Sequence, residues 1–148
     1  MRKTLIMAAL LAIAAPAMAS DVGLIKVSKG DVRIERAGAR LPAGVGAAVQ
    51  ASDVIVTGGD GLAGITFTDN SLVSLGPNSV FSIDKYRFDS TTHAGEFESS
   101  LTRGRLAAIS GKMVKQSPES MKVRTPSAIM GVRGTEFIVQ VDEPAARQ

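Results

Sequence analysis

An all-β domain is the fold class that this sequence predicts, and three observations predict it. Short apolar runs recur along the chain and are separated by clusters of glycine, aspartate and asparagine. These turn signals follow one another about every 8 to 12 residues, which is typical of a sandwich, a barrel or a coil of strands. Several runs alternate apolar with polar residues, the period of a strand with one buried face. We therefore expect a single domain of many short antiparallel-type strands, in a sandwich-like or coiled-strand, solenoid-like arrangement.

The first residues have the features of an export signal. Arg2 and Lys3 form a basic start, residues 5–15 are apolar, and residues 17–19 (Ala-Met-Ala) form a small-x-small cleavage motif. The apolar run is shorter than the roughly 20 residues that a transmembrane helix needs. The sequence therefore predicts a protein that is periplasmic or secreted and does not span a membrane.

Cleavage after Ala19 would divide the chain into a signal peptide (1–19), an all-β domain (20–142) and a frayed tail (143–148). The domain has no cysteine, so its core must stabilise it without disulfides in an oxidising compartment. Removing the two basic residues of the signal leaves 15 basic against 14 acidic residues, a net charge of +1. A role in nucleic-acid binding is therefore not predicted.

The first strands of the domain are expected at residues 22–27 and 32–36. They are joined around residues 29–31 (Lys-Gly-Asp), which predicts a hairpin. Residues 38–46 predict a turn followed by a short edge strand.

The next two strands are expected at residues 53–57 and 62–68. The loop between them contains Gly58, Asp60 and Gly61 and is able to supply positive φ angles. Alternate residues of the second strand are expected to share one face: Ala63, Ile65 and Phe67.

Turns at residues 69–71 and 76–78 flank a short strand at 72–75, and Phe81 and Ile83 then alternate with polar residues. A polar loop follows.

A further strand is expected at residues 97–101, a turn at 103–105, and another strand at 106–109. Between residues 107 and 115 one or two helical turns compete with strand, because alanine and methionine weaken the β signal.

The segment MKVRTPSAIMGVRGTEFIVQV, residues 121–141, reads as two strands and an ordered connection. Pro126 fixes its own φ and pushes Thr125 toward extended backbone, so the first strand should end in a bend there. Gly131 and Gly134 bracket a tight turn where φ could be positive, and Thr135 closes it. The last strand then alternates, with one face formed by Phe137, Val139 and Val141.

With these strands laid out, the sequence resembles the FecR domain family. The resemblance lies in DVIVTGGDGLAGITFTDNSLVSLGPNSVFSI at 53–83 and SLTRGRLAAISGKMVKQSPESMKVRTPSAIMGVRGTEFIVQV at 100–141. It implies a non-enzymatic all-β periplasmic domain, of the kind that relays signals from outer-membrane transporters to a cytoplasmic sigma factor. Ser52 and Asn70 stand where glycine is usual in the family.

The chain has neither the anti-sigma segment nor the transmembrane helix of the signalling members, so their relay across the inner membrane is not carried over. We expect a stand-alone exported interaction module that binds an envelope protein, without a cofactor.

Catalytic and metal-binding patterns are weak in this sequence. The single histidine, His93, lies in a polar loop and is expected to be a surface residue. Asp53, Asp60 and Asp69 recur near turns, but their spacing does not match known calcium loops, and turn formation is favoured. An enzyme using Glu96 and Glu98 is a weaker alternative.

Candidate binding residues come from a charge asymmetry. One acidic residue and seven basic residues lie between positions 103 and 133, and the basic ones are Arg103, Arg105, Lys112, Lys115, Lys122, Arg124 and Arg133. If strands bring these cations together, they would attract an anionic glycan, lipid or protein surface; the alternative is an ordinary solvated face. Within the turn at 131–135, a structural corner is favoured over an anion site, and Arg133 is the residue expected to bind if any does.

Overall fold

The computed structural model describes residues 19–142 and shows one twelve-stranded sheet with one short helix, α1 (Lys112–Gln116). The strands in chain order are β1 (Asp21–Lys29), β2 (Val32–Arg36), β3 (Ala39–Pro42), β4 (Ala48–Gln50), β5 (Val54–Thr57), β6 (Leu62–Phe67), β7 (Leu72–Leu75), β8 (Val80–Phe88), β9 (Gly95–Ile109), β10 (Met121–Arg124), β11 (Ile129–Gly131) and β12 (Glu136–Val141). The predicted all-β class is confirmed. The expected signal peptide, up to residue 18, and the expected tail lie outside the described residues. Within residues 19–142, no helix has the length and apolar character needed to cross a membrane.

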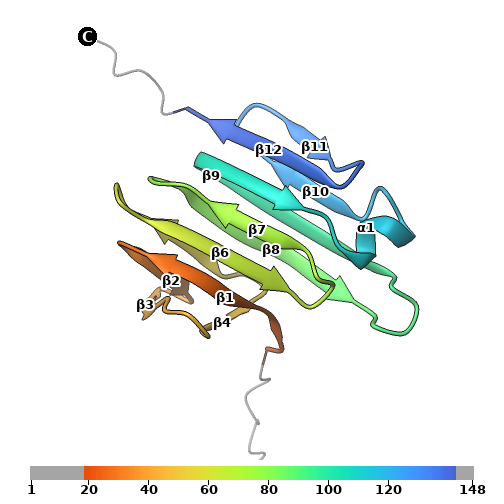
Figure 1. Cartoon of the computed structure of the whole chain (residues 1–148), viewed down its shortest axis with the longest axis horizontal. Coiled ribbons are helices and arrows are strands. Elements are labelled where there is room, and N and C mark those ends of the chain that lie inside the picture. Colours follow the sequence, from red (N-terminus) through yellow and green to blue (C-terminus); the bar gives the residue numbers. More distant parts are fainter. Residues whose placement is uncertain (1–18, 143–148) are drawn as a thin grey trace, which may run out of the picture.

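The sheet folds over along β9, so that its two halves face each other (Figure 1). Layer A contains β4, β1, β6, β7, the second part of β9 and β12, in that spatial order. Layer B contains β3, β2, β5, β8, the first part of β9, β10 and β11. The fold is thus a single curled sheet, and β9 is the strand that both layers share.

The core lies between the two layers. All three residues predicted to share a face of β6 are buried there: Ala63, Ile65 and Phe67. The Phe67 ring of layer A lies 4.6 Å from the Phe97 ring and 5.4 Å from the Tyr86 ring, both in layer B. Ring pairs of this kind contribute about 0.5–1.5 kcal/mol beyond their area burial, so they help to hold the layers together.

The hairpin predicted around Gly30 is wrong. Its two strands are present, but β1 pairs with β4 and β6 in layer A, whereas β2 pairs with β3 and β5 in layer B. The connection crosses between the layers. Gly30 has a φ of +65°, and the backbone N–H of Asp31 donates to Asp60 Oδ1 at 3.1 Å. The turn therefore bonds to the connection between β5 and β6, far along the chain, and not across a hairpin.

The loop at residues 58–61 also crosses between the layers, from β5 to β6. The positive φ angles that we expected there are absent, since neither Gly58 nor Gly61 has one. Their lack of a side chain serves close packing instead: a Cβ at Gly58 would lie 2.6 Å from Asp31 Oδ2, and one at Gly61 would overlap the Asp31 carbonyl oxygen. The Gly58 N–H donates to that carbonyl at 2.9 Å, so the two crossovers stack.

A third crossover, at residues 76–79, stacks on the second. Thr57 Oγ1 donates to the Gly76 carbonyl at 2.7 Å and accepts from the Ser79 N–H at 2.9 Å. Ser79 in turn packs against Gly104, where a Cβ would overlap its hydroxyl. The turn predicted at residues 103–105 is therefore wrong: the chain continues as one strand and bends at Gly104, whose φ is +94°.

Five non-glycine residues among 19–142 have the positive φ for which glycine is favoured, and Ser52 and Asn70 are two of them. Ser52 has a φ of 73° and Asn70 a φ of 67°. The resemblance described in the sequence analysis implies glycine at these two positions, and a left-handed backbone is the conformation in which glycine is favoured.

Between residues 107 and 115, where strand and helix were both considered, the structure has both: β9 continues to Ile109 and α1 begins at Lys112. The helix carries the chain back to layer B, where β10 runs parallel to β9. This pair is an exception to the antiparallel arrangement that we expected. The short strand β11 was not predicted, and it pairs with β10 at the edge of layer B.

Candidate functional site

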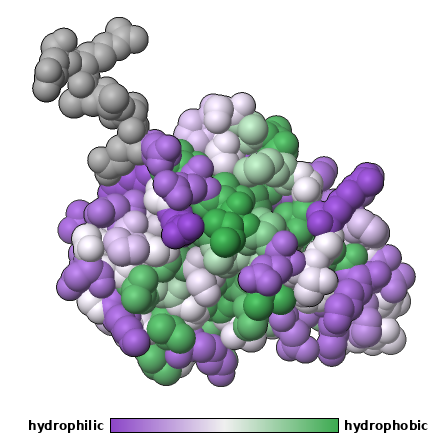
Figure 2. All heavy atoms as spheres, turned by 45° about the horizontal axis from the view of Figure 1, so that its top comes forward, coloured by the Kyte–Doolittle hydropathy of each residue, from purple (hydrophilic) through white to green (hydrophobic). Residues whose placement is uncertain are grey.

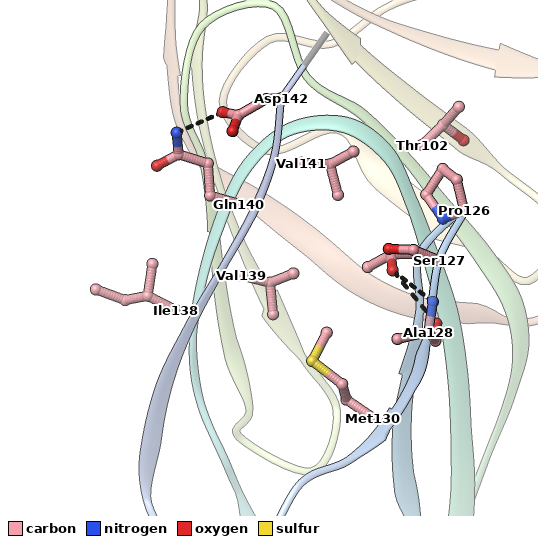
Figure 3. Close-up of a pocket in the computed structure, with 11 residues that line it drawn as sticks. Thr102, Pro126, Ser127, Ala128, Met130, Ile138, Val139, Gln140, Val141 and Asp142 are labelled. Carbon is pink, nitrogen blue, oxygen red and sulfur yellow. Dashed lines mark hydrogen bonds between the residues drawn. The ribbon is translucent and has the colours of Figure 1, made fainter. Parts of the chain in front are cut away.

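The two ends of the folded sheet differ. At one end, which we call the capped end, β3 and β4 are joined by residues 43–47, and Ala43 is buried. At the other, which we call the open end, β11 and β12 form the edges of the two layers. A groove of about 840 Å³ lies at the open end, bordered by β12 and residues 125–130 (Figure 3). It is lined by Thr102, Thr125, Pro126, Ser127, Ala128, Met130, Ile138, Val139, Gln140, Val141 and Asp142.

The side chains of β12 point alternately into and away from this groove. Val139 and Val141 point toward Met130 and residues 125–128, whereas Ile138 and Gln140 point to the opposite side (Figure 3). Ile138 is 60% exposed. Figure 2 shows that apolar side chains gather on the face of the molecule that includes this end. The groove therefore presents an apolar floor next to an exposed aliphatic side chain.

The outer edge of β12 has backbone groups without a neighbouring strand. The Ser110 N–H donates to the Thr135 carbonyl at 2.7 Å, which shows that the backbone of Thr135 faces β9. Alternate residues of a strand direct their N–H and C=O groups to the same side. The backbone groups of Glu136, Ile138 and Gln140 therefore face away from β9, and β9 is the one strand among residues 19–142 that pairs with β12.

The opposite wall of the groove is a closed turn. β10 ends at Arg124, where the sequence predicts that a bend begins, and the Thr125 N–H donates to the Ala128 carbonyl at 2.8 Å. Thr125 Oγ1 accepts from the Ala128 N–H at 3.1 Å. Together with the fixed φ of Pro126, these bonds hold the wall in place without help from a ligand.

The turn at residues 131–135 lies outside the groove lining. Gly134 has the expected positive φ, 107°, whereas Gly131 is the last residue of β11 and has none. Arg133 points to solvent and pairs with Glu119 at 3.1 Å, and both side chains are largely exposed. The structure thus shows a corner with a surface ion pair.

None of the basic candidate residues lines the groove, and they are distributed over several elements. Lys122 and Arg124 lie on the outer face of β10, in a second hollow that also contains Glu98 and Asp84. Lys122 is directly opposite Glu98 in the register of β9 and β10. Two acidic residues that precede the basic block in the sequence are therefore the neighbours of two of its members in space. The remaining candidates lie on α1 and on either side of the β9 bend: Lys112, Lys115, Arg103 and Arg105.

The three turn aspartates each accept hydrogen bonds within or between turns. Asp53 accepts from Arg36 at 2.7 and 2.8 Å and from the Gln50 N–H at 2.8 Å. Asp60 accepts from a neighbouring crossover, as described above, and Asp69 accepts from Ser71 Oγ at 2.7 Å. Among residues 19–142, no group of three or more histidine, cysteine or acidic side chains has a metal-binding arrangement.

The single histidine and the single tyrosine both contact neighbouring side chains of the fold. His93 stacks on Phe88, with ring centres 6.1 Å apart, in a turn between β8 and β9. The Tyr86 hydroxyl lies 3.2 Å from Asp69 Oδ1 and accepts from the Asp69 N–H at 3.1 Å. Burial raises the pKa of Tyr86 to about 12, so the phenol stays protonated at neutral pH and anchors the turn after β6.

Sequence reasoning missed most of the groove. Of the residues singled out, Thr125 and Pro126 line it, but Met130, Val139 and the exposed Ile138 were not recognised as a surface. One signal was present: Ile138 is an apolar residue on the otherwise polar face of the last strand, between Glu136 and Gln140.

Comparison of the sequence with models of protein families finds a family that matches this chain. The model of the family described as FecR protein matches residues 53–147, well over half of the chain. No match is found among curated proteins or among solved structures. The matched span begins just before β5 and includes the stacked crossovers from residue 58 onward, β9 and both strands of the open end.

Proposed function

The chain belongs to the FecR family, and from that premise we propose that it is an exported, signalling-related module that binds an envelope protein and catalyses no reaction. The observation that carries this proposal is the open end, where an apolar groove of about 840 Å³ lies beside the unpaired edge of β12. Export is inferred from the basic, apolar and small-residue pattern of residues 1–19.

Binding is favoured over turnover by the use that the fold makes of its reactive side chains. The buried carboxylates of Asp53 and Asp69 are occupied by hydrogen bonds to their own turns. Tyr86 is held by Asp69, and His93 is stacked on Phe88. The groove itself is lined by aliphatic and small polar side chains, which suit contact with another chain better than acid-base chemistry.

The alternative is binding to an anionic glycan or lipid through residues 103–133. It has less support, because Lys122 and Arg124 lie beside acidic side chains and Arg133 is paired with Glu119. The exposed lysines of α1 are what remains in its favour: Lys112 and Lys115.

The test is in-cell crosslinking from single photoreactive residues, with mass spectrometry of the captured material. A residue placed at Ile138 is expected to capture one defined envelope protein. The matched control is Val45, which is aliphatic and 69% exposed but lies at the capped end. A third probe at Arg133 samples the corner beside the groove.

Capture of one protein from Ile138 and not from Val45 supports the proposal. The same proteins from both positions, or none from Ile138, would overturn it.

The alternative is tested separately with vesicles of anionic lipid and with purified cell wall. It requires retention that falls with added salt, since screening shortens the Debye length to about 10 Å at 0.1 M. It also requires that charge reversal at Lys112, Lys115 and Arg124 abolish retention. Retention that is unchanged by the reversal contradicts the alternative.

A further inference from the structure

We propose that the partner docks at the open end as an added β-strand, antiparallel to β12, with alternate apolar side chains in the groove and basic residues at both ends. This inference rests on the proposed function, because it describes how the partner is held at the same site. Three features of the open end carry it: the backbone edge, the groove and the charges of β12.

The backbone edge is long and unprotected. β12 is six residues long, has no proline or lysine, and directs the N–H and C=O groups of Glu136, Ile138 and Gln140 outward. Natural proteins usually protect such edges with short strands, proline or lysine, because an exposed edge is a template for another strand. Strand addition is a common mode of peptide recognition, in which main-chain bonds give affinity and alternate pockets give specificity.

The groove determines which side chains the added strand must carry on one face. In an antiparallel pair, residues directly opposite each other project to the same face of the sheet. Residues opposite Val139 and Val141 would therefore enter the groove, where they meet Met130 and Pro126. These contacts are apolar, and the flexible methionine side chain can adapt to different shapes. The partner strand must therefore have apolar residues at every second position.

The charges at the two ends of β12 determine which residues the added strand must have at its own ends. Glu136 and Asp142 lie at the two ends of the edge, and neither forms an ion pair with another residue between 19 and 142. Asp142 accepts a hydrogen bond from Gln140 Nε2 at 2.9 Å. Cationic residues opposite these two carboxylates complete the pairing, since opposite charges across strands are favourable and like charges are not.

The probe is the capped heptapeptide acetyl-KVTVTVK-amide, in which the valines face the groove and the lysines face the two carboxylates. The readout is amide hydrogen exchange of the purified protein, followed by NMR. Saturating peptide should slow exchange at Ile138 and Gln140 at least about tenfold, the effect of a new hydrogen bond worth about 1.4 kcal/mol. The amides of β3 at the capped end should not change.

Two peptide controls separate strand addition from general stickiness. N-methylation of both threonines removes the N–H groups that face β12 and should abolish protection, whereas N-methylation of two valines modifies the far edge and should not. The peptide acetyl-VKTVTKV-amide has the same composition but directs lysine into the groove, and it should not protect.

A charge exchange tests the ends of the strand. Glu136→Lys should weaken binding of the lysine peptide about threefold, because it replaces a favourable cross-strand pair with a pair of like charges. The same variant should strengthen binding of acetyl-EVTVTVE-amide. Equal binding of both peptides by both proteins would overturn the charge assignment.

The outcomes distinguish this inference from the proposed function. Unchanged exchange with every peptide, or equal effects of the two N-methylated forms, would overturn strand addition even where Ile138 still captures a protein in cells. Amides of Ile138 and Gln140 that are protected without peptide and lose protection on dilution would show a second copy on β12, which also overturns it. Protection by the peptide without capture in cells would count against the proposed function alone.

Discussion

The capped end and the open end of the sheet protect their strand edges to different degrees. At the capped end the edge strands are four and three residues long, and β3 includes Arg40 and Pro42. The Arg36 guanidinium there binds buried Asp53 and also donates to the Ala48 carbonyl of β4 at 3.2 Å, so it links layer B to layer A. The open end has no comparable link among the described residues, and its edge strand β12 is twice as long as β4. The edge strands of the capped end are thus short and linked by a side chain, whereas β12 offers a longer edge.

The largest effect is expected at the bend of β9, where the two layers meet. Gly104→Ala places a Cβ onto Ser79 Oγ at a φ of +94°, so it should reduce the free energy of unfolding by at least about 3 kcal/mol. Gly134→Ala at the open end has a similar φ but open space around it, and should cost about 1 kcal/mol. Urea denaturation measures both. Equal losses would show that packing at the bend is not what joins the layers.

The next effect compares one ion pair at each end. Asp53→Asn removes the charge that holds Arg36, Gln50 and β4, and should destabilise the protein by about 2–3 kcal/mol. Glu119→Gln removes the exposed partner of Arg133 and should change stability by less than about 0.5 kcal/mol. The comparison fails if thermal or urea denaturation gives the same result for both variants.

A third variant separates binding from stability. Ile138→Lys adds a charge to the free edge of β12 and should reduce partner capture, measured from a photoreactive residue at Gln140 of the same edge, at least about tenfold, since lysine on an edge discourages strand pairing. It should change the free energy of unfolding by no more than about 0.5 kcal/mol, because the side chain is 60% exposed. Val45→Lys at the capped end should leave capture unchanged. A loss of capture in both variants would remove the distinction between the ends.

Alkaline titration tests whether the two ends unfold together. Tyr86 lies between them and is the only tyrosine in a chain without tryptophan, so tyrosinate absorbance reports on it alone. Its pKa is raised to about 12, so the native state keeps a proton that the unfolded chain releases near pH 10. The stabilisation is therefore complete below about pH 10 and declines as the pH rises toward 12. If one end lost its structure at a lower pH than that at which tyrosinate absorbance appears, the two ends would unfold independently.

The sequence predicted the positions of the strands better than it predicted which strands pair with each other. Alternation located β6, the first part of β8 and β12, because the period of a strand is a local property that the side chains reveal. Alternation does not say which strand lies alongside. A Gly-Asp turn serves a hairpin and a crossover equally well, so the connection at Gly30 was assigned to the wrong one.

The candidate site was predicted less well, for a related reason. The cations of residues 103–133 form a block in the sequence, but parallel pairing of β10 with β9 places Lys122 beside Glu98. The groove depends on β11 and β12 being edges of different layers, which is a property of the whole topology. The local sign that the sequence did offer was an isoleucine, Ile138, on a polar face.

The sharing of β9 by both layers also orders the assembly of the molecule in time. β8 and β9 are adjacent in the chain, so their hairpin closes a short loop at low entropic cost. The second half of β9 then offers an edge to which β7 adds, and later β12. β12 cannot join the sheet before the second half of β9 is in place, because β9 is the one strand among residues 19–142 with which it pairs. In any partly folded form that lacks β12, β9 is therefore the strand with the unprotected edge.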